Sequence, residues 1–405
     1  MAKKLNSVVG IDIGSRSIKV AELKSQGRDV VVTALGMADT PEGAVDHTGI
    51  YNGDAVANAV KAALQHAGSG VSAAVVSIAG QASVLVRTLE VPKMSPTELR
   101  EHMQWEINRN IPFAESTVVS DFKVLGDEDP NAQNMDVVMA ISPQSAVDAL
   151  MSCIRKAGRQ LAAIDVEPLG LARSVHTSYG EDWKDETVCL VDVGHKTTSI
   201  NIYKNGKLLM PRQVPVGGEM FVKALADARG VGAEDAESLL RRVDLSGVQT
   251  GAGGTQEFQP YNPFAEGGEA PPAEAQAVPA EGDAPAEGAE AAESPAPAAP
   301  EPAASSDDAK ALSDVMGEFI AEIRRSIDYF KSKGGDVSRL AVCGGGARLK
   351  GLEKYLNQAL GLPCDLYDPL HRLQINAKKA DADYVDAHRQ EFAVAVGNGL
   401  YILYD

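Results

Sequence analysis

Short apolar and alternating runs separated by polar turns dominate the first eighty residues of this 405-residue chain. Runs of this kind predict β-strands, because successive side chains of a strand point to opposite faces of a sheet. The predicted strands are Val8–Ile13, Ile18–Leu23, Val30–Met37 and Val71–Ala79. Before the last of them, apolar residues recur every four positions over Gly53–Gln65, which predicts an amphipathic helix. Strands, then a helix, then a strand indicate a mixed sheet in an α/β domain.

The next block of the chain, Val84–Leu161, is predicted to be a small α+β insertion. Its helix, Ser95–Asn110, opens with a capping box of Ser95 and Glu98 and carries an apolar stripe on one face. Two strands and a second helix are predicted after it, at Val118–Leu125, Asp136–Ile141 and Gln144–Lys156. Trp105 lies off the apolar stripe, and between a core position and a partner-binding position we favour partner binding.

The second half of the chain repeats the opening pattern. An apolar strand at Val188–Val193 leads through Asp192 and Gly194 into a polar turn and a second strand, as the first strand does through Asp12 and Gly14. A further strand and three helices are predicted at Lys207–Pro215, Glu219–Ala228, Ala233–Arg242 and Val315–Phe330. The shared order of strand, Asp-x-Gly, turn and strand indicates a weak internal duplication.

From about residue 246 to residue 306 the apolar pattern gives way to Ala, Pro, Glu and Gly. Ten of the chain's 21 prolines lie between Gly251 and Pro302. Such a composition cannot bury enough apolar surface to offset the entropy lost on ordering. Because an apolar-striped helix is predicted soon afterwards, we expect a disordered acidic insertion within one domain rather than a linker between two.

The net charge of −18 is unevenly distributed along the chain. Residues 251–309 contain twelve of the 56 acidic residues and no Lys or Arg, so the rest of the chain carries only about −6. Nucleic acid is therefore a poor candidate partner, because binding to phosphates requires a basic face.

Cysteine usage and hydropathy indicate where the protein works. Four scattered cysteines without a CxxC pair indicate a reducing compartment rather than a disulfide framework or a zinc site. No run approaches the roughly 20 apolar residues of a membrane-spanning helix. We expect a cytoplasmic protein with no direct membrane insertion, associated with a membrane only through protein partners.

A carboxylate and a small polar turn follow the first predicted strand in the stretch "GIDIGSRSIK". A carboxylate beside backbone amides is costly unless a cation binds there, and a magnesium–phosphate complex supplies one. We predict that the amides from Gly14 to Ser17 face phosphate oxygens, that Asp12 holds Mg²⁺ through water, and that Lys19 reaches a phosphate. An ordinary β-hairpin with a surface aspartate is the alternative for this motif taken alone.

The stretch "LVDVGHKTTSINIY" repeats this arrangement with Asp192, Gly194, Thr197 and Thr198. Two such hairpins facing each other would hold phosphates from both sides, with two aspartates sharing one hydrated Mg²⁺. Two unrelated hairpins are the alternative. His195, within the turn, is expected to be a loop residue rather than a catalytic base.

A third motif is "LAVCGGGARLKGL", in which an apolar strand enters Gly344–Gly346 and a helix is predicted to begin near Leu349. Three glycines let a flat adenine or ribose lie against the backbone, and a helix N-terminus favours negative groups. A tight connection between strand and helix is the alternative.

In this order the three motifs resemble the phosphate-1, phosphate-2 and adenosine motifs of the actin–Hsp70–sugar kinase superfamily. The resemblance implies an α/β, actin-like (ribonuclease H-like) two-domain fold that binds ATP and Mg²⁺. Within it, "AIDVEPLGLARSV" looks like the first connecting helix and "QEFAVAVGNGL" like the second, and Glu167 becomes the candidate for positioning the attacking water. The implied nucleotide-binding residues are Asp12, Gly14, Ser15, Arg16, Ser17, Lys19, Asp192, Gly194, Thr197, Thr198, Gly217, Gly218, Glu237, Arg241, Gly344, Gly345, Gly346 and Arg348.

Within the superfamily, the chain most resembles the type IV pilus assembly protein PilM family, which is related to the division protein FtsA. The most specific match is Met103–Gly126, whose "WE…IPF…V…D…VLG" pattern runs through an inserted subdomain, called 1C, in that family. The resemblance implies an ATP-binding scaffold that holds the cytoplasmic N-terminal tail of a PilN-like inner-membrane protein in a groove between subdomains 1A and 1C. Other type IV pilus assembly proteins are expected partners, and self-association is left open.

The resemblance also implies a division of the chain. Subdomain 1A comprises residues 1–83 and, with the first connecting helix, 165–186, and the 1C insertion comprises 84–164. Subdomains 2A and 2B comprise residues 187–245 and 307–385, the acidic insertion 246–306, and the second connecting helix 386–405.

Two other functions stay open at this point. A small-molecule kinase on the same fold would carry a catalytic aspartate and large substrate insertions, whereas the insertion here resembles 1C. An FtsA-like division protein would ordinarily end in an amphipathic membrane-targeting helix, but this chain ends at "VGNGLYILYD". ATP turnover is expected to be slow or absent, because no second general base beside Glu167 is evident.

Overall fold

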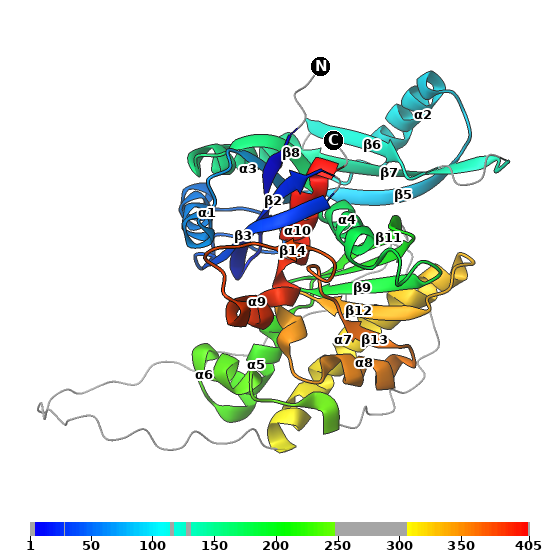
Figure 1. Cartoon of the computed structure of the whole chain (residues 1–405). Helices are drawn as coiled ribbons and strands as arrows, with labels where there is room; N and C mark the ends of the chain where they lie inside the picture. The colour runs from blue at the N-terminus through cyan, green and yellow to red at the C-terminus, as the bar shows by residue number, and fades with distance from the viewer. Residues whose placement is uncertain (1–4, 28, 114–116, 127–130, 248–305, 404–405) are drawn as a thin grey trace, which may run out of the picture. The chain divides into compact units, whose positions relative to one another are not determined.

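The computed structural model describes residues 5–27, 29–113, 117–126, 131–247 and 306–403 (Figure 1). The predicted acidic insertion lies outside these residues except at its two ends. There, Leu245–Gly247 forms a short 3-10 helix and Ser306 begins a long helix, so both ends are ordered elements rather than parts of the insertion.

Two mixed sheets form the framework. The first sheet has the strand order β14-β3-β2-β1-β4-β8 and the second has the order β11-β10-β9-β12-β13. The first comprises β1 (Ser7–Ile13), β2 (Ser17–Gln26), β3 (Asp29–Asp39), β4 (Ala73–Ile78), β8 (Gln160–Val166) and β14 (Gln374–Ile375). The second comprises β9 (Thr187–Val193), β10 (Thr198–Lys204), β11 (Lys207–Val214), β12 (Arg339–Cys343) and β13 (Cys364–Leu366).

The two sheets repeat one topology, which confirms the predicted duplication. β1 pairs antiparallel with β2 and parallel with β4. β9 likewise pairs antiparallel with β10 and parallel with β12. Five strands thus follow in the same order and directions in each half, as expected for an actin-like, ribonuclease H-like pair of domains.

Helices cover both faces of each sheet. On the first sheet, α1 (Gly53–Ala67) and α3 (Gln144–Lys156) pack on one face, and α10 (Ala393–Gly399) packs on the other. On the second sheet, α4 (Glu167–Tyr179) packs on the face opposite a larger helical layer. That layer contains α5 (Gly218–Arg229), α6 (Ala233–Leu240), α7 (Ser306–Ser332) and α8 (Leu352–Leu360).

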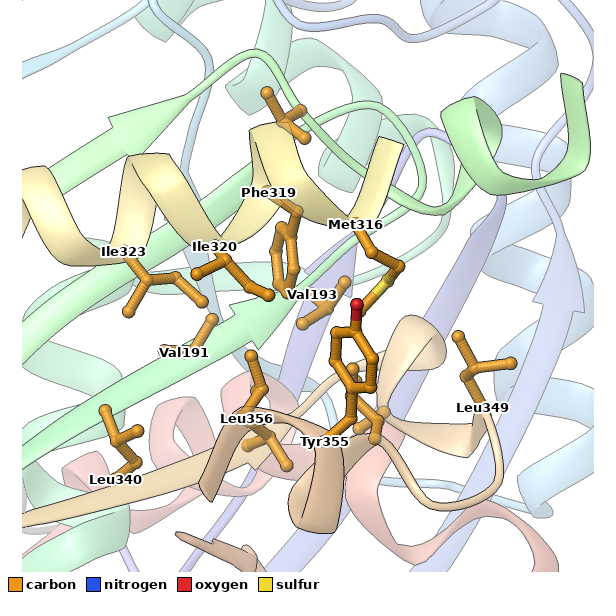
Figure 2. Close-up of a cluster of buried hydrophobic side chains, with 14 of the residues drawn as sticks. Val191, Val193, Met316, Phe319, Ile320, Ile323, Leu340, Leu349, Tyr355 and Leu356 are labelled. Carbon is orange, nitrogen blue, oxygen red and sulfur yellow. The ribbon is translucent and has the colours of Figure 1, made fainter. Parts of the chain in front are cut away.

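The largest apolar core lies under this helical layer. Met316, Phe319 and Ile323 project from α7 toward the sheet, where Val191 and Val193 of β9 meet them (Figure 2). Leu356 and Tyr355 close the core from α8. Spacings of three and four residues along α7 place these side chains on one face, which is why the apolar stripe predicted this helix.

α10 is packed directly against β1 in the interior of the first domain (Figure 1). A Cβ atom at Gly10 would overlap the carbonyl oxygen of Ala395, so only glycine allows this approach. Asn398, fully buried, donates from Nδ2 to the carbonyl of Ile11 at 2.9 Å and accepts from Ser77 Oγ at 2.7 Å. The second connecting helix therefore holds the strand that carries Asp12.

A third, small sheet has the order β5-β7-β6 and carries α2 on one face. Its elements are β5 (Leu85–Pro92), α2 (Pro96–Arg109), β6 (Val118–Val124) and β7 (Asn134–Pro143). The predicted capping box of Ser95 and Glu98 at the start of α2 is confirmed. We call these four elements the small sheet unit.

The structure divides the block Val84–Leu161 differently from the α+β insertion that the pattern predicted. Leu150, Cys153 and Ile154 of α3 belong to the core of the first sheet, and β8 pairs with β4. α3 and β8 thus pack with the first domain, because the apolar stripe of α3 packs in the same core as the buried face of α1. The subdomain boundaries given above stay predictions.

The small sheet unit also contacts the second sheet. Thr88 Oγ1 of β5 donates to the carbonyl of Leu209 at 2.8 Å, and Lys207 Nζ lies 2.6 Å from Asp136 Oδ2. Val138 of β7 is buried in the same core as Leu208 of β11.

Most other predicted elements agree with the structure to within a few residues, but α7 begins at Ser306, well before the predicted Val315. β5, β8, β13, β14 and the helix α9 (Ala382–His388) have no counterpart in the sequence predictions. No helix in the described part of the chain is long and apolar enough to cross a membrane.

Candidate functional site

The three predicted motifs meet around one cavity of about 280 Å³. The ends of β1 and β9, the glycine turn after β12 and the start of α4 all reach it. Its lining includes Asp12, Gly14, Ser15, Arg16, Ser17, Lys19, Glu167, Asp192, Gly194, Thr197, Gly218, Glu237, Arg241, Gly344, Gly345, Gly346 and Arg348. The topology explains this meeting, because β1 and β9 hold equivalent central positions in their sheets.

The first hairpin places a buried cation beside a carboxylate. Gly14 N–H donates to the carbonyl of Ser17 at 3.2 Å, and register pairs Asp12 with Lys19 across the strands. Lys19 Nζ lies 3.2 Å from Asp12 Oδ2. Burial lowers the pKa of Lys19, but the charges of Asp12, Glu391 and Asp192 outweigh this and raise it above the usual value. Lys19 is thus a fixed positive charge at the cavity wall.

The second hairpin reproduces the first. Gly194 N–H donates to the carbonyl of Thr197 at 3.0 Å, and register pairs Asp192 with Ser199. Ser199 therefore stands where Lys19 stands in the first hairpin. Burial together with the charge of Asp12 raises the pKa of Asp192 to about 6.

Glu167 is the first residue of α4, directly after the edge strand β8. Its side chain is hydrogen-bonded to Ser199, and burial together with the charge of Asp192 raises its pKa to about 8. Without a bound cation, Glu167 therefore carries a proton at neutral pH and cannot accept another one.

The glycine turn fits closely against the second hairpin. Gly344 has φ +83°, and a Cβ atom there would overlap Asp192 Oδ1. Beyond it, Arg348 Nη1 lies 3.1 Å from Glu391 Oε1, which His388 Nδ1 also approaches at 2.8 Å. Burial raises the pKa of Glu391, but His388, Lys19 and Arg348 outweigh it and leave the pKa below its usual value.

An ion pair joins the two halves at the rim of the cavity. Arg16 Nη2, from the first hairpin, lies 3.0 Å from Glu237 Oε2 of α6. Arg241 Nη2, one helical turn further along, lies 3.6 Å from the same carboxylate oxygen. Both guanidinium groups thus share one acidic side chain.

Three predicted residues lie away from the cavity. Thr198 is buried and donates to the carbonyl of Val216 at 2.6 Å. Gly217 precedes α5, where it packs against the carbonyl of His195. Trp105 lies on α2 with 55% of its surface exposed, and the guanidinium of Arg109 stands 4.5 Å from its ring centre.

The helix that was predicted to begin near Leu349 begins later in the structure. Gly345–Arg348 forms a 3-10 helix, and α8 begins only at Leu352. The backbone of Lys350 pairs with Asp244 in a parallel bridge, so that residue cannot be helical. Similarly, the first four residues of "AIDVEPLGLARSV" belong to β8, and the second connecting segment opens with a 3-10 turn at Arg389–Phe392.

Several lining residues were missed from the sequence, among them Ser199, Lys196 and Glu391. Ser199 and Lys196 become evident when "DIGSRSIK" is aligned with "DVGHKTTS", because they take the places of Lys19 and Arg16. Glu391 carries no such signal, since its place in the cavity depends on how the C-terminal segment folds back.

The donor set suits a metal held mainly by phosphate and water. Among the described residues, no group of three or more His, Cys, Asp or Glu is placed to hold a metal ion. Mg²⁺ usually binds through one or two carboxylates, several waters and the substrate phosphates. The facing aspartates and the turn amides therefore fit a magnesium–phosphate group.

Two repeated sheets that enclose such a cavity define an actin-like protein of the ribonuclease H-like class. Residues 10–248 match the family model of the type IV pilus assembly protein PilM, and residues 189–397 match that of the cell division protein FtsA. The first match spans more than half of the chain, so the chain belongs to the PilM family.

Solved structures share the fold of this chain. The structure of a PilM–PilN type IV pilus biogenesis complex is similar to this chain with a TM-score of 0.75, 22% identity and 99% coverage of both chains. EutJ from Carboxydothermus hydrogenoformans is similar with a TM-score of 0.50, 12% identity and coverage of 99% and 92%. Likeness at this identity establishes the fold alone.

FtsA of Neisseria meningitidis is 25% identical over 59% of this chain and 65% of its own length. FtsA of Pseudomonas aeruginosa is 26% identical over 61% of this chain and 64% of its own length. The chain thus spans less than two thirds of the length of these curated relatives.

Proposed function

We propose that this protein is an ATP-binding scaffold of a type IV pilus assembly complex, located in the cytoplasm and held at the inner membrane by protein partners. Its expected partner is the N-terminal cytoplasmic tail of a PilN-like inner-membrane protein. One observation carries the proposal: in a chain of the PilM family, two aspartate hairpins and a glycine turn converge on one cavity.

Nucleotide binding follows from the chemistry of the cavity. The turn amides and Lys19 suit phosphate oxygens, and Asp12 and Asp192 suit the waters of a bound Mg²⁺. A polyphosphate with Mg²⁺ would also offset the cost of two buried carboxylates close together. The exposed face of Gly345 and the guanidinium of Arg348 supply a surface for the nucleoside.

Hydrolysis is expected to be slow or absent. A group that activates water must accept a proton, and Glu167 holds one when its pKa is near 8. Bound Mg²⁺ favours the ionised form of nearby acids, which would let Glu167 position a water. Nucleotide binding therefore serves mainly to bias the arrangement of the two halves.

A second cavity supports a docking place for the partner tail. It has a volume of about 300 Å³ and lies between first-sheet residues such as Ile78 and α3 residues such as Ala149. Apolar side chains such as Ile50 and Leu150 line it together with five hydroxyl-bearing residues, which are Thr48, Tyr51, Ser77, Ser83 and Ser145. An extended peptide with small apolar side chains fits such a groove, and the PilM–PilN complex among similar structures makes a PilN-like tail the expected peptide. Trp105 on α2 is proposed as a further partner contact.

The test is capture of a synthetic PilN-like tail peptide by the protein, with and without Mg-ATP, together with measured ATP affinity. Wild type is expected to bind both ligands, with tail affinity changed by Mg-ATP. Asp12→Ala is expected to lose ATP binding by at least about tenfold while staying folded. Ala149→Trp, which fills the groove, is expected to lose the tail but keep ATP.

Asp29→Ala, at the exposed start of β3, is the matched control and should bind both ligands normally. Unchanged ATP affinity in folded Asp12→Ala protein would refute the nucleotide site. Tail binding that survives in Ala149→Trp would refute the groove.

A further inference from the structure

The ion pair of Arg16 and Glu237 joins the first hairpin to α6. Residues 221 positions apart in sequence meet here, one on the turn that follows β1 and the other on α6 of the second domain's helical layer. Both side chains line the candidate nucleotide cavity.

This pair lies at the rim of the cavity rather than at its floor. At the floor only 13% of the Lys19 side chain is exposed, whereas at the rim 54% of the Arg16 side chain and 24% of the Glu237 side chain are exposed. A ligand that reaches the floor from solvent has to pass such a rim. Arg241 approaches the same oxygen of Glu237, so this carboxylate faces two guanidinium groups.

We propose that the Arg16–Glu237 ion pair is a gate across the mouth of the cleft, which opens for a nucleotide to enter or leave and so sets its exchange rate. The proposal rests on the nucleotide binding proposed above. The pair links an element of each half directly, so its opening removes one direct link between the two walls of the cavity. Its partial exposure makes it weak enough to open often and sensitive to salt.

The experiment measures release of the fluorescent nucleotide mant-ATP, loaded with Mg²⁺, after a chase with excess unlabelled ATP. Arg16→Ala and Glu237→Gln are each expected to release it about two- to five-fold faster, as suits a half-exposed ion pair. The double variant is expected to release it no faster than the faster single variant, because both changes break one interaction. Raising NaCl from 0.05 to 0.5 M should speed release from wild type more than from Arg16→Ala.

A second readout uses the nucleotide-free protein. Glu237→Gln is expected to raise amide hydrogen exchange in the peptide that contains Gly14–Ser17, although residue 237 belongs to the other half. Glu322→Gln is the matched control, since it breaks the 2.7 Å ion pair with Arg212 away from the cavity. That control should leave both the release rate and the exchange of the turn unchanged.

Each outcome decides between the proposals. Release rates that are unchanged in both single variants, or that multiply in the double variant, would overturn the gate while leaving nucleotide binding intact. Wild-type protein that does not bind mant-ATP would overturn the proposed function and the gate with it. Faster release with a non-additive double variant, and faster exchange of the turn, would support the gate.

Discussion

The surroundings of two glutamates that line the cavity shift their pKa values in opposite directions. Among the described residues no ion pair joins Glu167 to a cation, and burial and the charge of Asp192 outweigh the charge of Lys19 and hold the proton. Glu391 is also buried, but His388, Lys19 and Arg348 surround it and favour the ionised carboxylate. The same side-chain type is thus a proton carrier at one wall and a fixed negative charge at another.

Replacing Glu167 with Gln should stabilise the nucleotide-free protein as pH rises. The folded protein binds the Glu167 proton up to about pH 8, while the unfolded chain releases it near its ordinary value of 4.5. Wild type therefore loses stability between about pH 4.5 and 8, and Glu167→Gln escapes this loss. The gain should be on the order of a few kcal/mol at pH 8 and small at pH 4.5, measured by urea unfolding at both pH values.

Glu391→Gln is the control with the opposite sign. Its lowered pKa means that the carboxylate contributes stability above its unfolded value of 4.5 and that this contribution is lost on acidification. The variant should therefore be less stable than wild type at pH 8, with the deficit shrinking toward pH 4. A pH-independent effect of Glu167→Gln would show that its burial does not hold a proton.

Among the elements, the short helix α10 positions Asp12 of the cavity, although of α10 itself the lining includes Val394 alone. Its small residues let it lie against β1, and Asn398 ties it to the carbonyl of Ile11, one residue before Asp12. Buried polar groups of this kind are costly when left unpaired. The helix thus holds the end of the strand that presents the aspartate.

Asn398→Ala should destabilise the protein by about 2–4 kcal/mol, because it leaves the Ile11 carbonyl and the Ser77 hydroxyl without their partner in a dry core. Denaturant unfolding measures the loss. Ser95→Ala, which removes the exposed cap of α2, should cost only about 1 kcal/mol and serves as the comparison. Equal losses in the two variants would argue against a special role for the buried amide.

At the scale of the whole molecule, the small sheet unit rests on both domains. Adjacent residues of β7 face in opposite directions: Met139 packs under α2, while Val138 packs with Leu208 and Tyr203 of the second sheet. A movement between the halves must therefore either shift this unit or break its contacts with β11. A movement of the two walls of the candidate cavity can therefore be transmitted to the part of the molecule that carries α2.

Val138→Ala should cost about 1–3 kcal/mol and raise amide hydrogen exchange in β11 as well as in β7, because one core spans both strands. Met139→Ala is the matched control on the same strand. It should cost about 2–5 kcal/mol yet raise exchange only within the small sheet unit. Unchanged exchange in β11 in the Val138 variant would show that the two sheets are not coupled through this core.

The sequence by itself determined the local features of this protein. Periodicity marked most strands and helices, Ser95 and Glu98 marked the start of α2, and the repeated Asp-x-Gly turn indicated two equivalent hairpins. These signals are readable because hydrogen bonds within a turn or a helix join residues close in sequence.

Only the tertiary structure decided which distant residues share the cavity. Glu391 lines the cavity and Thr198 does not, because the face of a strand or turn that packs inward decides which side chains reach it. Neither the Arg16–Glu237 contact nor the placing of α3 with the first domain has a local signature. Such contacts depend on how whole sheets are brought together, and no spacing along the chain records that.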